Sequence, residues 1–264
     1  MGLFGKLKKK KTARLGLCLS GGGARGFAHV GAIKAFEEEG IDFDLVVGVS
    51  AGSIVGAFYA AGKTAEEITL YGEKLDMKNV HNGIVVTPND AAKIGRIVSD
   101  FLGDVRIENL KKQFACVAVD LVDARQIILD RGNAAEAVSA SSCVPLLFKP
   151  VIYGARHLVD GGLLNNIPAD VCKMLGADKV VTVDVNPTRG GGTKEVSLLP
   201  VIKATFSIMT ANASIAGLKN SDIVIAPNLS RFSSSSKDGW REMILLGYEE
   251  TRKHIDEIKA LLKE

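Results

Sequence analysis

Short, nearly continuous apolar segments recur along the chain and alternate with segments of helical periodicity. Their Val, Ile, Leu and Ala residues are not interleaved with polar ones, which is the pattern of strands buried on both faces. Helices between such strands favour parallel pairing. We therefore predict an α/β fold of three layers (α/β/α), in which helices cover both faces of a mostly parallel central sheet. The apolar segments are residues 14–20, 44–50, 114–120, 179–185 and 222–227.

The composition is that of a single globular domain. The chain has 264 residues, of which 47% are hydrophobic and 24% charged. No uninterrupted apolar stretch reaches the roughly 18 residues that cross a bilayer. The four cysteines are far apart and show no metal-ligand spacing, so we expect reduced thiols, no metal site and a cytoplasmic protein. One domain over residues 14–264 is predicted, preceded by a tail of residues 1–13.

The positive charge is concentrated in the first 14 residues, which contain six basic residues and no acid. One interpretation is a solvated, frayed terminus. The other is peripheral contact with an anionic membrane at its inner face, where Leu3, Phe4 and Leu7 enter the interface and each nearby lysine contributes about 1 kcal/mol. The lysines of the tail are Lys6, Lys8, Lys9, Lys10 and Lys11.

A serine lies between two glycines where the second apolar segment ends. Gly48-Val49-Ser50-Ala51-Gly52 fits G-x-S-x-G, in which a sharp turn from strand to helix lifts a nucleophilic serine clear of the sheet. Glycine is needed there because strand and helix come so close that side chains would clash. The alternative is a turn of small residues packed under a helix.

A glycine-rich loop follows the first apolar segment and opens a helix. Gly21, Gly23 and Gly26 of GGGARG satisfy G-x-G-x-x-G, the dinucleotide fingerprint. The acid that would bind a ribose is missing at the end of the second strand, which disfavours a dinucleotide. Bare N–H groups at a helix N-terminus also bind other anions, including the oxyanion of a tetrahedral intermediate. If the first two strands are adjacent and parallel, this loop and Ser50 meet at one edge of the sheet.

A serine nucleophile needs a base, and none of the four histidines is convincing. His254 lies in a charged helical stretch, and His29 and His157 are at positions typical of structural residues. His81 lies in a segment without clear periodicity.

Asp160 is a better candidate for the base. It ends the apolar segment HLVD and is followed by Gly161 and Gly162, which permit close backbone approach. A carboxylate can act as a base if partial burial raises its pKa and the hydroxyl lies within hydrogen-bond reach. The alternative is an ordinary Asp-Gly turn.

Together, these three motifs resemble the patatin-like phospholipase family. GGGARG at 21–26, GVSAGS at 48–53 and DGG at 160–162 stand in the order of that family, and residues 118–185 read like its central block. The resemblance covers roughly residues 14–190 and is closest to small, single-domain bacterial members. It implies a patatin-like fold with the nucleophile elbow after the second strand.

The resemblance also implies a Ser–Asp dyad in place of a triad. Ser50 matches the nucleophile and Asp160 the proton acceptor, with the N–H of Ala51 as an additional oxyanion donor. Neither a metal, a cofactor nor a nucleic acid partner is implied. The remaining motif positions are Gly21, Gly22, Gly23 and Arg25 in the oxyanion loop, and Gly26, Gly48, Gly52, Gly161 and Gly162.

The implied activity is that of a serine acyl hydrolase of the esterase, phospholipase A or lysophospholipase type. Its substrate would be a lipid or small acyl ester, from which a fatty acid is released through an acyl-enzyme. Two alternatives stay open. The first is a weakly catalytic regulatory or binding protein of the same fold. The second is acyl transfer to an alcohol.

Several further segments are candidates for the surroundings of the site. Residues 77–90 and 188–197 are predicted to border its entrance, and a long apolar helix over 198–220 either walls an acyl channel or packs in the core. The polar tract 231–239 is predicted to be a solvated surface loop. Cys143 either lines the pocket or is a buried structural thiol.

Overall fold

The computed structural model describes residues 13–74, 91–186 and 193–263. The lysines of the basic tail lie outside the described residues. So do the predicted entrance segment 77–90 and residues 188–192 of the second one.

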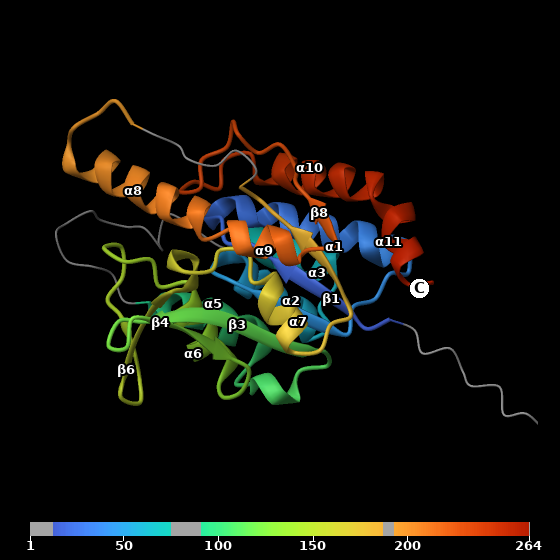
Figure 1. Cartoon of the computed structure of the whole chain (residues 1–264), viewed down its shortest axis with the longest axis horizontal. Helices are drawn as coiled ribbons and strands as arrows, with labels where there is room; N and C mark the ends of the chain where they lie inside the picture. Colours follow the sequence, from blue (N-terminus) through green and yellow to red (C-terminus); the bar gives the residue numbers. More distant parts are fainter. Residues whose placement is uncertain (1–12, 75–90, 187–192, 264) are drawn as a thin grey trace, which may run out of the picture.

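One sheet organises the described chain (Figure 1). Its parallel strands are β1 (Leu15–Leu19), β2 (Leu45–Gly48), β3 (Gln113–Asp120), β7 (Lys179–Val183) and β8 (Ile223–Ile225). They lie in the order β3-β2-β1-β7-β8, which confirms the predicted parallel sheet. Because β1 and β2 are neighbours, the glycine loop and Ser50 leave the sheet at the same edge.

Antiparallel strands extend the sheet beyond β3. β4 (Arg125–Leu129) pairs with β3, and β5 (Val151–Tyr153) forms a hairpin with β6 (Arg156–Asp160). β6 also pairs with β3, where Ala118 stands opposite Asp160. The hairpin therefore places Asp160 beside Ala118 of β3.

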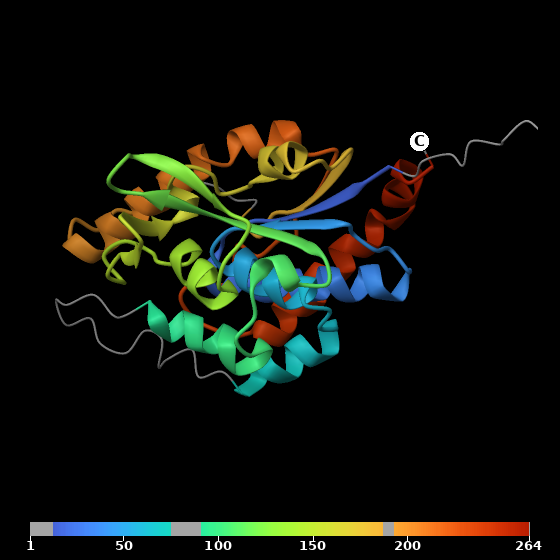
Figure 2. The ribbon, with the colours of Figure 1, turned by 90° about the horizontal axis from the view of Figure 1, so that it is seen from below.

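Helices cover both faces of the sheet, which confirms the three predicted layers (Figure 2). One face carries α1 (Phe27–Glu38), α2 (Ala51–Ala60), α3 (Ala65–Lys74), α5 (Ala92–Leu102), α6 (Ala134–Ser141) and α10 (Trp240–Lys253), which α11 (Ile255–Leu261) follows. The other face carries α7 (Ala169–Met174), α8 (Leu198–Asn212) and α9 (Ile215–Asn220). Short 3-10 helices are η1 (Gly23–Gly26), η2 (Ile107–Asn109) and η3 (Gly161–Leu163).

Successive strand residues pack into two separate cores. Leu17 and Leu19 of β1 and Val46 of β2 contribute to the larger core, which contains side chains of α1, α2 and α10. Cys18 and Val47 contribute to the smaller core with α7. Because both strand faces are covered, every residue of β1 and β2 is buried. This explains the continuous apolar segments in the sequence.

The helix predicted over 198–220 is two helices, α8 and α9, and it is not a core helix. By length and composition alone, residues 200–220 form a helix apolar enough to cross a membrane. Ser214 interrupts it, and its hydroxyl donates to Thr210 O (2.8 Å). No described side chain of α8 is buried, whereas Gly217 of α9 packs against Ile167. The expectation that this segment packs in the core is therefore wrong for α8.

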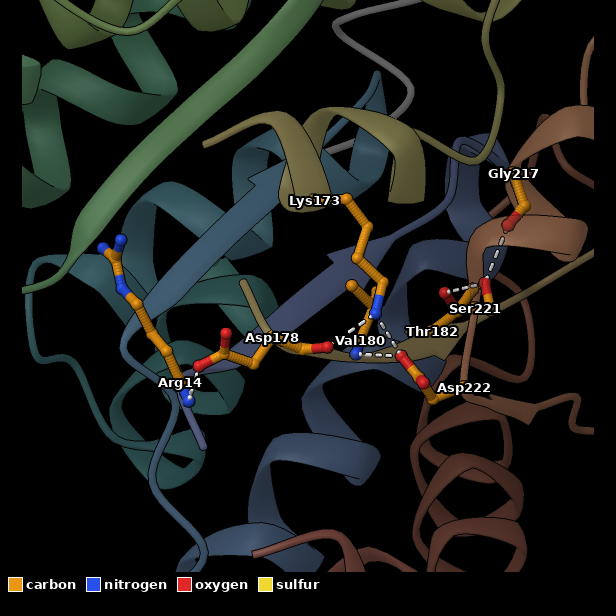
Figure 3. A network of polar contacts seen from close by, with 8 residues as sticks. All are labelled: Arg14, Lys173, Asp178, Val180, Thr182, Gly217, Ser221 and Asp222. Carbon is orange, nitrogen blue, oxygen red and sulfur yellow. Dashed lines mark hydrogen bonds and ion pairs between the residues drawn. The ribbon is translucent and has the colours of Figure 1, made fainter. Parts of the chain in front are cut away.

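A polar network ties β8 to the amino end of the sheet (Figure 3). Asp222 Oδ2 accepts hydrogen bonds from Val180 N (2.7 Å) and Lys173 Nζ (2.6 Å). Lys173 Nζ also donates to Asp178 O (2.8 Å), and Asp178 Oδ2 accepts from Arg14 N (2.7 Å). These bonds fix the starts of β1, β7 and β8, at the opposite sheet edge from Ser50.

Two glycines let α1 and α10 approach each other closely. A Cβ on Gly31 would collide with the backbone of Ile244 and Tyr248. A Cβ on Gly247 would collide with the backbone of Ala28. The two helices therefore touch through their backbones at this crossing.

Candidate active site

Ser50 occupies the turn between β2 and α2 in a strained backbone conformation. Its φ is 51° and its ψ is −126°, a combination that non-glycine residues rarely adopt. A Cβ on Gly48 would collide with the backbone of Gly52. A Cβ on Gly52 would collide with the carbonyls of Leu19 and Ser20. The close approach of strand and helix therefore requires both glycines.

Hydrogen bonds from α6 and α2 hold this turn. The Ser50 N–H donates to Ser141 O (3.2 Å) and Oγ (3.1 Å). The Ser141 hydroxyl donates in turn to Val117 O (2.7 Å) on β3. On the other side, the Ser53 hydroxyl donates to Ser50 O (2.6 Å). The Ser50 backbone is thus fixed at both its N–H and its carbonyl, while the residue itself is partly exposed.

The strand register brings Asp160 to the level of Ser50. Gly48 at the end of β2 pairs with Cys116 of β3. Ala118, two residues farther along β3, pairs with Asp160. Ser50 is likewise two residues beyond Gly48, so the two side chains arrive at the same height above the sheet edge.

The Asp160 carboxyl group is buried, with 1% of the residue exposed. Its Oδ1 accepts the Gly162 N–H (2.8 Å), and its Oδ2 has no hydrogen-bond partner in the described structure. Burial raises the pKa of Asp160 to about 6, against smaller lowering effects of the Ser50 hydroxyl and the Gly162 N–H. The Ser50 hydroxyl is therefore close enough to the Asp160 carboxyl group to lower its pKa, although no hydrogen bond joins the two groups in this structure and Oδ2 has no partner among the described residues.

The glycine loop between β1 and α1 packs directly against the Ser50 turn. A Cβ on Gly21 would stand 3.4 Å from Ser50 Cβ. A Cβ on Gly26 would stand 2.7 Å from Ala51 Cβ, too close for any side chain. Glycine at position 26 therefore allows the two turns to meet, whereas a Cβ on Gly21 would collide with Asn166 Oδ1.

Three backbone N–H groups beside Ser50 have no acceptor within the part of the chain that the structure describes. They belong to Gly22, Gly23 and Ala51. The Gly21 N–H differs, because it donates to Asn166 O (3.2 Å). Of the four donors considered from the sequence, Gly21 is thus already engaged, and the other three are open to a ligand.

Arg25 braces the glycine loop from outside. Its Nε donates to Phe232 O (2.9 Å) and its Nη1 to Asn186 Oδ1 (3.1 Å). The Asn186 amide nitrogen donates in turn to the carbonyl of Gly21. The guanidinium group therefore supports the glycine loop through these hydrogen bonds.

The polar tract 231–239 is more than the predicted solvated loop. Phe232 is buried in the larger core, and Ser234 O accepts the Ala24 N–H (2.8 Å). A Cβ on Gly23, whose φ is +58°, would collide with the same Ser234 carbonyl. Most of the tract is exposed as predicted, but its backbone at Phe232 and Ser234 closes over the glycine loop, which composition does not reveal.

His29 is a buried structural residue of α1. Its ring is buried, and Nε2 donates to Ser20 O (2.9 Å) at the end of β1. Burial lowers its pKa to about 4, so the ring is neutral at pH 7. It supports the start of the glycine loop from below.

Neither of the other two described histidines belongs to the Ser50–Asp160 pair. His157 is exposed on β6, and His254 lies at the end of α10, 3.1 Å from Glu257. His81 lies outside the described residues. No described histidine forms a hydrogen bond with Ser50 or Asp160.

Cys143 is a buried structural thiol. Its Sγ donates to Lys149 O (3.0 Å), and its carbonyl accepts the Asp160 N–H (2.9 Å). It therefore supports the strand end that carries Asp160 and does not line an open pocket. Among the described residues, no group of three or more His, Cys, Asp and Glu side chains could hold a metal ion.

Asn166 and Asn186 belong to this site, although no motif singles them out. Asn186 directly follows the predicted strand 179–185, at the sheet edge where Ser50 lies. Asn166 stands four residues after Gly162. A polar residue just beyond a buried strand, at the edge where ligands bind, is the signal that would have found Asn186.

Comparison with known proteins identifies the family of the chain. A family model for patatin-like phospholipases matches residues 17–173. An uncharacterized NTE family protein of Mycobacterium tuberculosis is 32% identical over 257 residues, which cover 86% of this chain and 44% of that protein. A lysophospholipase of Aspergillus fumigatus is 33% identical over 195 residues, covering 70% of this chain and 13% of that protein. The chain thus spans less than half the length of these relatives.

Solved structures share the fold at low sequence identity. VipD of Legionella pneumophila has a TM-score of 0.62 and 16% identity, covering 93% of this chain and 67% of that one. Human GIVD cytosolic phospholipase A2 has a TM-score of 0.56 and 10% identity, covering 99% and 61%. Such identities establish the fold alone. With the family model matching more than half of its residues, the chain belongs to the patatin-like phospholipase family.

Proposed function

We propose that the protein is a serine acyl hydrolase in which Ser50 is the nucleophile and Asp160 is the proton acceptor. One observation carries this proposal: the Ser50 hydroxyl, on a strained turn, is close enough to the buried Asp160 carboxyl group to lower its pKa, and Oδ2 of that group has no hydrogen-bond partner among the described residues. A buried carboxylate with a raised pKa can accept the hydroxyl proton directly, so no histidine is needed between them.

Acylation follows from this arrangement. Asp160 takes the proton as Ser50 Oγ attacks the ester carbonyl carbon, and the carbonyl oxygen becomes an oxyanion. The N–H groups of Gly22, Gly23 and Ala51, which lack acceptors, bind this oxyanion, and each such donor contributes about 10²–10³ in rate. Protonated Asp160 then gives its proton to the departing alcohol, which leaves an acyl-serine.

Deacylation repeats the same steps with water. Asp160, ionised again, accepts a proton from a water molecule that attacks the acyl-serine carbonyl. The second tetrahedral intermediate uses the same N–H donors. Its collapse returns the proton from Asp160 to Ser50 Oγ and releases the carboxylic acid.

The substrate we propose is an acyl ester of a phospholipid or lysophospholipid. The support is family membership together with a relative named as a lysophospholipase and a structural neighbour named as a phospholipase A2. Transfer of the acyl group to an alcohol would use the same acyl-serine, and added alcohol that appears as an ester product would reveal it. The buried, unbridged cysteines favour a reducing, cytoplasmic location.

A fluorescent fluorophosphonate tests the assignment directly, because it phosphonylates an activated serine. Wild type should be labelled, Ser50→Ala should not be labelled at all, and Asp160→Asn should be labelled at least about 10²-fold more slowly. Hydrolysis of a soluble short-chain ester should fall in parallel.

Matched controls are available on the exposed surface. Ser99→Ala on α5 and Asp130→Asn after β4 remove the same groups outside the site and should keep wild-type labelling. Labelling that persists in folded Ser50→Ala, or folded wild type that is never labelled, would refute the proposed dyad. The second result would favour the regulatory alternative.

A further inference from the structure

One face of α8 is exposed, apolar and free of charge. Six residues spaced by three or four positions share it, as a helical period of 3.6 requires. We call them the α8 stripe: Leu198 (76% exposed), Val201 (41%), Thr205, Ile208 (57%), Met209 (43%) and Asn212. An ordinary surface helix places charged side chains on this face and apolar ones against the core. In α8 the exposed face is the one without charged residues.

Apolar exposure continues around the stripe. Val196 precedes α8, Leu164 follows η3, and Ile215 opens α9; all three are at least 49% exposed. At the β3–β4 turn, Leu121 and Val122 are exposed as well. Figures 1 and 2 place α8 and this turn at the same end of the molecule. Contiguous exposed apolar patches of this kind commonly mark surfaces that bind a protein or a membrane.

The helix that carries the stripe adjoins the Ser50–Asp160 pair. α8 packs on η3, the turn that begins directly after Asp160. A Cβ on Gly162 would stand 3.4 Å from Thr210 Cγ2 on the inner side of α8. The thickness of α8 thus separates the stripe from the turn that follows Asp160.

Within the segment that carries the stripe, the charges are of one sign. From Val196 to Ser221 the sequence contains Lys203 and Lys219 but no Asp or Glu, while Lys194 and Glu195 precede this range and Asp222 follows it. An apolar face flanked by lysines is complementary to an anionic headgroup layer above an acyl region.

We propose that the α8 stripe docks on the surface of a lipid bilayer, with α8 lying in the plane of the interface. The proposal rests on the proposed function, which supplies a lipid as the substrate. A bilayer fits better than a second copy of the chain, since the proposed substrate is a lipid and Lys203 and Lys219 of this segment suit an anionic headgroup layer. Residues 200–220 do not span the membrane, because Ser214 breaks the helix and Gly217 is packed against Ile167.

The test measures vesicle binding separately from catalysis. All binding is measured in the Ser50→Ala background by flotation with phosphatidylcholine vesicles, alone and mixed with phosphatidylglycerol. Adding Ile208→Glu or Met209→Glu should weaken binding to both kinds of vesicle at least about tenfold. The matched control is Leu245→Glu on α10, in the opposite layer, where the residue is similarly exposed (52%) and binding should be unchanged.

Folding is checked by near-UV circular dichroism and the unfolding midpoint, with Ile208→Ser as the milder variant if Ile208→Glu does not fold. With Ser50 restored, the ratio of activity on vesicles to activity on a soluble ester should fall at least about tenfold in Met209→Glu.

Three results would overturn the docking proposal. The first is unchanged binding in both glutamate variants. The second is binding that needs anionic lipid, disappears at high salt and ignores Ile208→Glu, which would assign it to basic residues alone. The third is a dimer that Ile208→Glu dissociates while the parent fails to bind vesicles. Vesicle binding by a protein whose Ser50 is never labelled would instead refute the proposed function and leave the docking in place.

Discussion

At the scale of single residues, Asp160 meets two opposing demands. A proton acceptor must be ionised at the working pH, whereas burial favours the neutral carboxyl group. The pKa of about 6 lies between the two limits: the group is ionised at pH 7, yet basic enough to accept a proton in the transition state. The Ser50 hydroxyl and the Gly162 N–H on Oδ1 both limit the rise.

This pKa predicts the pH dependence of the reaction. Ionised Asp160 is the competent form, so kcat/KM for a soluble ester should rise with pH, with a midpoint at about 6, and then level off. A pH–rate profile of wild type checks this, with the Asp130→Asn variant giving the same curve. A flat profile between about pH 5 and pH 8 would contradict the role of Asp160.

The same residue predicts an effect on stability. The pKa of Asp160 is raised from 3.8 to about 6 on folding, so its stabilising contribution is fully present below 3.8 and is lost as the pH rises through 6. By pH 8 the loss amounts to about 3 kcal/mol. The Asp160→Asn variant has no carboxyl group to ionise at this position, so it does not lose stability in this way as the pH rises.

The free energy of unfolding of Asp160→Asn, relative to wild type, should therefore increase by about 2–3 kcal/mol between about pH 4 and pH 8. Urea unfolding at several pH values measures it. His29 contributes equally to both proteins, because its pKa of about 4 makes it lose stability as the pH falls in either chain. A difference that does not change with pH would show that the Asp160 pKa is not raised.

At the scale of secondary-structure elements, the contact between α1 and α10 is the closest helix pairing described above. Gly31 and Gly247 remove the side chains that would keep the two backbones apart. In an ordinary helix interior, replacing Gly by Ala stabilises by about 0.5–1 kcal/mol. At this crossing the added methyl group would meet the backbone of the partner helix.

We therefore expect Gly247→Ala to destabilise the protein by about 1–3 kcal/mol, the opposite sign to helix propensity. Thermal or urea unfolding measures the change. A variant as stable as wild type, or more stable, would mean that the helices separate without cost.

The elements also show which expectations a sequence can support. The Ser50 turn is predictable because Gly48, Ser50 and Gly52 act within five residues of each other. The brace of Arg25 is not, because its acceptors on Asn186 and Phe232 follow 161 and 207 residues later. The exposure of α8 is missed for a related reason: apolar composition predicts burial, and only the positions of the neighbouring helices show that one face has no cover.

At the scale of the whole molecule, the two edges of the sheet are used differently. The amino edge is held together by the hydrogen bonds of Asp222 and Lys173. The carboxyl edge carries Ser50, the glycine loop and Asp160, together with the strained backbone. The parallel direction of the strands was predictable from their continuous apolar segments. The position of Asp160 depends on the antiparallel pairing of β6 with β3. The residues of the hairpin do not specify this pairing.

The tract that closes over the glycine loop has a consequence for the nascent chain. Ser50 and Asp160 leave the ribosome long before Phe232 and Ser234, whose carbonyls hold Arg25 and Ala24. Phe232 follows Asp160 by 72 residues, so the nucleophile and the base are both made well before the loop receives these acceptors. A chain still being synthesised therefore holds Ser50 and Asp160 before the tract that supports the glycine loop exists.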